Sequence, residues 1–260
     1  MTRIGKRLAN GGKALIGYIT AGDPSLDATP RLVSALVRGG VDVLELGVPF
    51  SDPIADGPVI QRASERALAA GTSLRKVLGI AGCVRREHPD LPIILFTYMN
   101  PVVRYGFEAL ARDAATAGID GILLTDLSVE EAGGYVKVMR AAGLDTIFLA
   151  APTSTERRLR LIAQHSSGFV YLVSRTGVTG ERASLSDAVA PLARAMRRVT
   201  DMPLAVGFGI STREQVAAVA GVADAVVVGS AFVHVIEKGG ADMEQRVEAL
   251  ARELKSGLCR

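Results

Sequence analysis

Short apolar runs alternate with amphipathic stretches along the whole chain of 260 residues. Runs of this length, rich in Val, Ile and Leu and bounded by Gly, Pro, Asn, Asp or Ser, predict β-strands. The predicted strands cover residues 15–20, 41–46, 92–98, 121–125, 145–150, 169–173, 203–208 and 224–228. Between the strands, apolar residues recur at helical spacing, which is typical of helices that pack one face on a sheet. The predicted helices fall within residues 32–40, 59–87 with a break at 71–73, 100–117, 129–142, 156–165, 187–199, 211–220 and 243–254, with a short one after Ser230.

The regular alternation of strand and helix predicts an α/β fold. Continuous apolar runs are typical of strands that are covered on their outer face in a parallel sheet. No Gly-Ser linker or charge run divides the chain. We therefore predict a single (β/α)8 TIM barrel domain over residues 1–260, with extra short helices. A doubly wound sheet is disfavoured because it normally uses fewer strands and has a Gly-rich turn after the first.

Composition excludes several classes of function. The net charge is only +3, and the arginines are spread over predicted helix faces without interleaved aromatic residues, so no nucleic-acid partner is expected. The longest apolar run, at 225–236, is too short and interrupted to cross a membrane. Cys83 and Cys259 lie far apart and the three histidines are scattered, so neither a disulfide framework nor a metal site is predicted. These features suit a reducing cytoplasm.

Two carboxylates flank the loop that follows the second predicted strand. The period of two places Val43, Glu45 and Gly47 on one face of that strand and the leucines between them on the other. A buried glutamate without a partner has a raised pKa, which suits proton transfer near neutral pH. Asp56 lies at the far end of the Pro-rich loop. The alternative interpretation is a strand-end glutamate that reaches solvent and an aspartate that merely caps the next helix.

Glycines follow the last three predicted strands at the face where a TIM barrel carries its active site. Gly209 follows strand seven, and Gly229 with Ser230 follows strand eight at the start of a short helix. Glycines let backbone N–H groups approach an anion, and a helix N-terminus adds its positive end. Together with Gly177 and Gly180 after strand six, these positions predict a phosphate site, although glycine is also common in turns.

The loop after strand six, from Ser174 to Ser186, is the longest in the chain. Gly177 and Gly180 could serve as hinges, so the loop is expected to act as a lid that excludes water. An ordinary surface loop is the alternative.

Four segments together closely resemble the tryptophan synthase alpha subunit family, over nearly the whole chain. They are Glu45–Pro53 with Ala55–Pro58, Tyr18–Pro24, Ser174–Gly180 and Gly207–Ile210. The resemblance implies a (β/α)8 barrel that cleaves indole-3-glycerol phosphate to indole and glyceraldehyde 3-phosphate. It further implies that indole passes to a separate beta subunit, in an αββα heterotetramer, for L-tryptophan synthesis. Pyridoxal phosphate (PLP) is expected only in that beta subunit, and no cofactor is expected in this chain.

The resemblance also implies roles for individual residues. Glu45 is similar to the catalytic acid/base of the family and Asp56 to the group that holds the indole N–H. Tyr171 matches a tyrosine near the reacting centre, and Tyr18, Phe96 and Leu123 would wall the indole pocket. The positions that match the phosphate-binding residues are Gly180, Gly209, Gly229 and Ser230.

The implied chemistry agrees with the two carboxylates. Breaking the bond from indole C3 to the glycerol chain requires a proton at C3, loss of the proton of the adjacent hydroxyl, and stabilisation of positive charge at the ring nitrogen. Glu45 would supply the first and Asp56 the third, while the sequence leaves open which group accepts the hydroxyl proton. Two alternatives remain open: an autonomous indole-3-glycerol phosphate lyase that releases indole, and a catalytically weak allosteric partner of a beta subunit.

Overall fold

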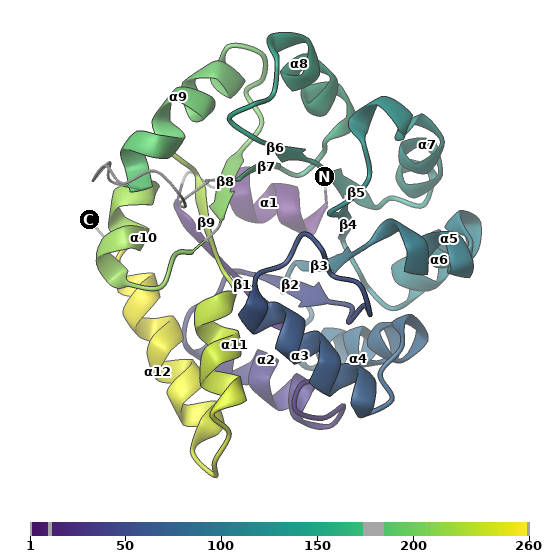
Figure 1. Ribbon diagram of the computed structural model, residues 1–260, viewed down its shortest axis with the longest axis vertical. Helices are drawn as coiled ribbons and strands as arrows, with labels where there is room; N and C mark the ends of the chain where they lie inside the picture. Colours follow the sequence, from purple (N-terminus) through teal and green to yellow (C-terminus); the bar gives the residue numbers. More distant parts are fainter. Residues whose placement is uncertain (1, 10–11, 174–184, 208, 259–260) are drawn as a thin grey trace.

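The computed structural model describes residues 2–9, 12–173, 185–207 and 209–258. In these residues nine parallel strands form one sheet, and helices surround it (Figure 1). The strands are β1 (Ala14–Thr20), β2 (Val43–Gly47), β3 (Ile93–Thr97), β4 (Gly121–Leu124), β5 (Asp145–Ile147), β6 (Leu149–Ala150), β7 (Val170–Val173), β8 (Leu204–Gly207) and β9 (Ala225–Val228). The helices are α1 (Arg3–Ala9), α2 (Ala28–Arg38), α3 (Pro58–Ala69), α4 (Leu74–Glu87), α5 (Met99–Tyr105), α6 (Phe107–Thr116), the 3-10 helix η1 (Val129–Glu131), α7 (Gly133–Ala141), α8 (Glu156–His165), α9 (Leu185–Arg197), α10 (Arg213–Ala220), α11 (Ser230–Glu237) and α12 (Met243–Ser256).

The sheet closes on itself at Phe148. Its strand order is β5-β4-β3-β2-β1-β9-β8-β7-β6, so β5 and β6 are its two ends, yet only Phe148 separates them in the chain. The Tyr171 N–H donates a hydrogen bond to the Phe148 carbonyl oxygen at 3.0 Å, which continues the ladder across the break. β5 and β6 are therefore the two halves of the predicted fifth strand. The result is an eight-stranded barrel of the predicted (β/α)8 type.

Alternate residues of each strand pack in two separate hydrophobic clusters. Ile16 and Val43 point into the barrel, whereas Leu15 and Leu44 pack outward against the helices. Burial on both sides explains why the strands are continuously apolar in sequence. The inward cluster also contains Ile4 and Leu8 of α1, so this helix fills one end of the barrel. A cavity is left at the other end, where the carboxyl ends of the strands lie.

Two predicted helices are interrupted. The helix predicted over 100–117 is broken into α5 and α6 by Gly106, which has φ of 91°, a conformation that favours glycine. The helix predicted over 129–142 begins as η1 and continues as α7 after Ala132.

The helix predicted over 211–220 begins at Arg213 as α10, and its N-cap is Thr212. The Thr212 side chain accepts a hydrogen bond from the Gln215 N–H, and the Gln215 side chain accepts one from the Thr212 N–H. This reciprocal capping box satisfies two donors at the helix start. Ser211 instead contacts the Gln215 side chain from outside the helix.

Candidate active site

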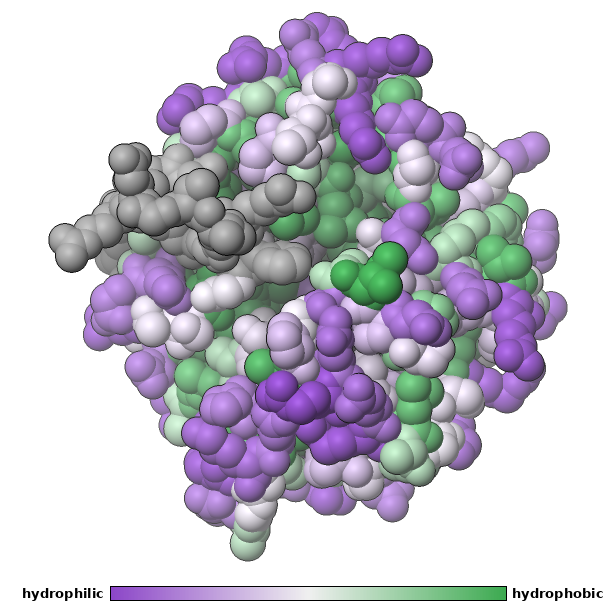
Figure 2. Space-filling view, viewed as in Figure 1, coloured by the Kyte–Doolittle hydropathy of each residue, from purple (hydrophilic) through white to green (hydrophobic). Residues whose placement is uncertain are grey.

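A cavity of about 330 Å³ lies at the carboxyl ends of the strands. This volume is within the range of small-molecule sites, from about 300 Å³ upwards. Figure 2 shows hydrophobic side chains in a hollow near the middle of this face, with hydrophilic ones around the rim. The described residues that line the cavity are Tyr18, Glu45, Asp56, Gly57, Pro58, Val59, Ile60, Phe96, Tyr171, Gly209, Val227, Gly229 and Ser230.

Glu45 projects into this cavity from the middle of β2. Its backbone is in register with Tyr18 of β1, so both side chains lie on the inner face of the barrel, as the period of two predicts. Glu45 is only 1% exposed, and its Oε1 atom has no hydrogen-bond partner among the described residues. Burial raises the pKa of Glu45 to about 8, so the carboxyl group is mostly protonated at neutral pH.

Asp56 is held by the loop between β2 and α3. Its N–H donates to the Pro53 carbonyl oxygen at 3.0 Å, and the Gln61 side chain donates to the Asp56 carbonyl oxygen at 2.9 Å. The Tyr98 hydroxyl donates to the Asp56 carboxylate at 2.9 Å. Burial raises the pKa of Asp56 to about 6, an effect that the hydrogen bond from Tyr98 opposes. At neutral pH the two carboxyl groups therefore favour different protonation states.

Two tyrosines form walls of the cavity and each rests on a glycine of the neighbouring strand. A Cβ atom at Gly47 would clash with the Tyr18 hydroxyl, and one at Gly207 would clash with the Tyr171 hydroxyl. The Tyr18 ring also meets Phe96 edge to face, with ring centroids 5.1 Å apart. The strand glycines therefore make the room in which the two rings lie.

The predicted phosphate positions Gly209, Gly229 and Ser230 lie in the wall of the same cavity. Gly209 has φ of 71°, a conformation that favours glycine, and Ser230 is the first residue of α11. No Lys or Arg is among the described lining residues. An anion at this end would therefore be held by backbone N–H groups, the Ser230 hydroxyl and the positive end of α11. Gly180 and residues 174–184 of the predicted lid lie outside the described residues, and α9 already begins at Leu185.

Not every predicted residue reaches the cavity, and some that do were missed. Leu123 belongs to the inward cluster of the barrel rather than to the described cavity wall. Sequence reasoning missed Tyr98, the hydrogen-bond donor to Asp56, although its place at the end of the third predicted strand is a signal for the active face. Tyr98 itself is not among the lining residues; those that sequence reasoning missed are Gly57, Pro58, Val59, Ile60 and Val227.

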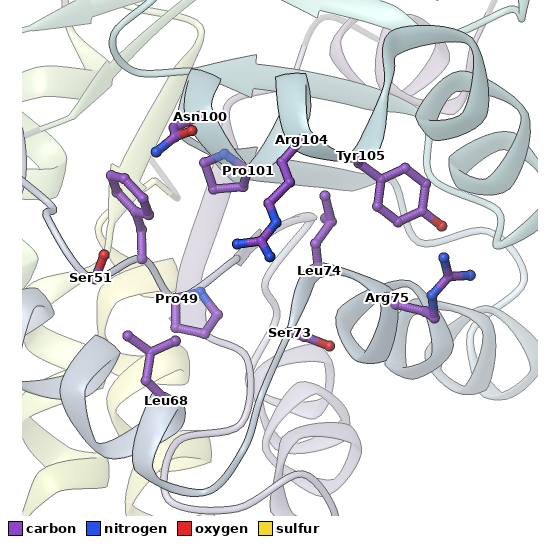
Figure 3. A pocket seen from close by; sticks show the side chains of 11 residues that line it. Pro49, Ser51, Leu68, Ser73, Leu74, Arg75, Asn100, Pro101, Arg104 and Tyr105 are labelled. Atoms are coloured by element: carbon purple, nitrogen blue, oxygen red, sulfur yellow. The ribbon is translucent and has the colours of Figure 1, made fainter.

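A second, more open depression of about 590 Å³ lies outside the barrel mouth. Figure 3 shows Arg104 extending over it from α5, Pro49 and Ser51 on one side, and Arg75 beside Tyr105 on the other. The Arg75 guanidinium lies 5.3 Å from the centre of the Tyr105 ring. None of the described residues that line this depression is a carboxylate, so it lacks the acid/base groups of the inner cavity.

The described part of the chain has neither a cluster of metal ligands nor a single helix able to span a membrane. It contains no group of three or more His, Cys, Asp or Glu residues that could hold a metal ion. None of its helices alone is long and hydrophobic enough to span a membrane. Taken together, α3 and α4 reach the required length and hydropathy, but the chain bends by 97° between them.

The sequence matches the family model of the tryptophan synthase alpha chain over residues 5–258. The chain belongs to the tryptophan synthase alpha chain family. The tryptophan synthase alpha chain of Solibacter usitatus is 63% identical over 263 residues, which cover 99% of this chain and 98% of that protein. The crystal structure of tryptophan synthase subunit alpha from Legionella pneumophila has a TM-score of 0.90 at 40% identity, and the match covers 99% of this chain and 98% of that one. A structure of tryptophan synthase from M. tuberculosis in an aminoacrylate-bound form has a TM-score of 0.89 at 38% identity. The match covers 99% of this chain and 100% of that one.

Membership of the tryptophan synthase alpha chain family confirms the predicted activity. The chain is a lyase of tryptophan biosynthesis that cleaves indole-3-glycerol phosphate. The structural matches likewise confirm the predicted TIM barrel.

Proposed function

We propose that Glu45 and Asp56 carry out the cleavage of indole-3-glycerol phosphate to indole and glyceraldehyde 3-phosphate within one barrel domain over residues 1–260. The observation that carries this proposal is the pairing, in one cavity, of a buried acid whose pKa is about 8 with a carboxylate whose pKa is about 6. Groups with separated pKa values in one site are the usual arrangement for acid and base roles near neutral pH.

In the proposed reaction, protonated Glu45 delivers its proton to indole C3. The bond from C3 to the glycerol chain then breaks, and its electron pair stays with the indole ring. The hydroxyl next to the broken bond loses its proton and becomes the carbonyl of glyceraldehyde 3-phosphate. Glu45, now a carboxylate, accepts that proton and returns to its starting state. Ionised Asp56 accepts a hydrogen bond from the indole N–H and stabilises the positive charge that develops there.

The remaining cavity residues are proposed to bind the two ends of the substrate. Tyr18, Phe96 and Tyr171 provide apolar area for the indole ring. Gly209, Gly229 and Ser230 are proposed to hold the phosphate. Gly180 stays a predicted member of the phosphate site, from its place in the loop after the sixth predicted strand and from the resemblance. Leu123 stays a predicted member of the indole pocket on the resemblance alone.

The dependence of kcat/KM on pH should be bell-shaped. Activity should fall below about pH 6, where Asp56 becomes protonated, and above about pH 8, where Glu45 loses its proton. In a Tyr98→Phe variant the acidic limb should move to higher pH, because the hydrogen bond that opposes the rise in the pKa of Asp56 is lost. Steady-state kinetics between about pH 5 and 9 tests this prediction. A flat profile over that interval would contradict the two assigned roles.

We also propose a cytoplasmic αββα heterotetramer, in which indole passes to a PLP-dependent beta subunit. The support is the family and the outer surface of the barrel mouth. Among the described large hydrophobic side chains, Ile54 and Val103 are the exposed ones, and they come from the same loop and helix as the lining of the depression in Figure 3. Exposed apolar side chains gathered in one region are typical of protein interfaces.

The proposed function is tested by measuring indole release from indole-3-glycerol phosphate by the purified chain, alone and with a beta subunit. Slow release alone that rises sharply with the partner is the expected result. Fast release that the partner leaves unchanged would favour an autonomous lyase. Absence of release in both states would favour a catalytically weak allosteric partner.

A further inference from the structure

Two helices that begin at opposite ends of the proposed substrate site lie side by side. α3 begins two residues after Asp56, at the indole end, and α11 begins at Ser230, at the phosphate end. Figure 1 shows the two helices next to each other in front of the sheet. Their inner sides meet in a small hydrophobic cluster that contains Ala63 of α3, Val233 of α11 and Tyr18 of β1.

On the outer side of this helix pair, ion pairs join the two helices. The Arg62 guanidinium donates to both carboxylate oxygens of Glu237, at 2.6 and 3.1 Å. Arg66, one turn further along α3, donates to Glu237 at 3.1 Å. Arg66 also donates two hydrogen bonds, of 2.8 and 2.9 Å, to Asp23 in the loop after β1. The Nδ1 atom of His234 in α11 lies 3.6 Å from the Oε2 atom of Glu237.

The network is more constrained than an ordinary surface ion pair. Asp23 is only 1% exposed, so its charge depends on Arg66 for compensation. Glu237 is the last residue of α11, where the helix dipole disfavours a negative charge. Despite that position, hydrogen bonds from Arg62 hold the pKa of Glu237 well below its usual range. The C-terminal end of α11 by itself would destabilise the negative charge of Glu237. The arginines of α3 stabilise that charge.

We propose that Arg62, Arg66 and Glu237 are positioning residues that fix the distance between the indole end and the phosphate end of the substrate site. This inference rests on the proposed function, because it takes Asp56 and Ser230 as the two ends. Helices are stiff over this length, so fixing their outer contacts also fixes the separation of their N-termini. A ligand that reaches both ends then gains affinity from the preset distance, whereas a ligand at one end gains none.

The probe for this role is 3-(indol-3-yl)propyl phosphate, which carries the indole and the phosphate but lacks the hydroxyl whose proton must leave. Indole and propyl phosphate serve as the two separate halves. In Glu237→Gln and in Arg62→Gln we expect the Kd of the linked ligand to rise about three- to tenfold, and the Kd of each half to change less than about twofold. Calorimetric titration measures all three ligands. With indole-3-glycerol phosphate, KM should rise while kcat stays nearly constant.

The chain offers a matched control in a second arginine–glutamate pair between helices. Arg38 of α2 contacts Glu248 of α12 at 2.8 Å, and Glu248 also binds Arg252. The side chains of Arg38 and Glu248 are 54% and 22% exposed, against 48% and 24% for Arg62 and Glu237. Neither α2 nor α12 contributes to the cavity wall. Glu248→Gln should leave all three Kd values unchanged, which separates a loss of general stability from a loss of positioning.

Three results would overturn the inference. One is an unchanged Kd of the linked ligand in both Glu237→Gln and Arg62→Gln. Another is a rise in the Kd of the linked ligand that Glu248→Gln reproduces. The third is an equal rise in the Kd of either half alone, which would mean that one end of the site is damaged and that the distance between the ends is not the cause.

If the unaltered chain fails to bind the linked ligand at all, the proposed function itself fails, and the positioning role falls with it. Arg66→Gln is less suitable because it leaves Asp23 charged and buried.

Discussion

Replacing Glu45 with glutamine should lower kcat for indole-3-glycerol phosphate cleavage by about 10²- to 10⁴-fold, the range for loss of a general acid. Glutamine has nearly the same shape as the protonated carboxyl group but has no acidic proton for indole C3. KM should change little, because the side chain acts on the reacting atoms and the binding contacts come from other residues of the cavity. Single-turnover measurement of indole formation checks this expectation. Near-normal turnover would exclude Glu45 as the acid.

The fold of Glu45→Gln should be intact, and its stability provides a separate readout. The pKa of Glu45 is raised from 4.5 to about 8 in the folded chain. The contribution of this raised pKa to stability is complete below about pH 4.5 and is lost as pH rises through about 8. The glutamine variant has no such proton to lose. Its free energy of unfolding should therefore fall less than that of the unaltered chain between about pH 6 and 9. Equal pH dependence of unfolding in the two proteins would contradict the buried, protonated state of Glu45.

Replacing Asp56 with asparagine should lower kcat/KM by about 10²- to 10³-fold, the range for loss of one electrostatic contact that strengthens in the transition state. The amide oxygen can still accept the hydrogen bond from Tyr98, so the loop should keep its position. Only the negative charge that is proposed to face the indole N–H is lost. Most of the effect should appear in kcat, because the positive charge on nitrogen develops during bond cleavage.

Tyr98→Phe is the matched control for Asp56→Asn. It removes a hydrogen bond to the same carboxylate but keeps the charge. Well above the pKa of Asp56, at about pH 8, it should lower kcat/KM far less than Asp56→Asn does. Similar losses in both variants at that pH would indicate that the position of the loop, rather than the charge, is what matters.

The fold could largely be predicted because parallel strands carry a strong signal. Each predicted run contains or overlaps an observed strand, since burial on both faces makes these residues apolar throughout. The break at Phe148 gave no signal, because that residue is as apolar and as buried as its neighbours. The break at Gly106 was missed because one glycine inside a helical pattern is compatible with a continuing helix.

The identity of the proposed catalytic carboxylates was easier to predict from sequence than the layer of the barrel in which each inward side chain lies. Glu45 stands out as a charge within an apolar run, and Asp56 follows it in a loop rich in proline. Leu123, which the resemblance names for the indole pocket, lies in the inward cluster of the barrel. The period of two along a strand indicates only whether a side chain faces the inside or the outside of the barrel. It does not indicate the layer of the barrel in which an inward residue lies, because that depends on the stagger between strands. The contact from Tyr98 to Asp56 joins two loops and has no counterpart in local sequence patterns.

β1 pairs with β2 on one side and with β9 on the other, so the first strand meets the last. During synthesis the chain presents Glu45 and Asp56 early, but Gly229 and Ser230 leave the ribosome only after all nine described strands. A nascent chain can therefore contain both carboxylates and still lack the glycines proposed to bind phosphate. Such long-range pairing also makes the final closure one of the slower steps of folding. With the proposed roles, catalysis becomes available only once β9 has paired with β1 and closed the ring.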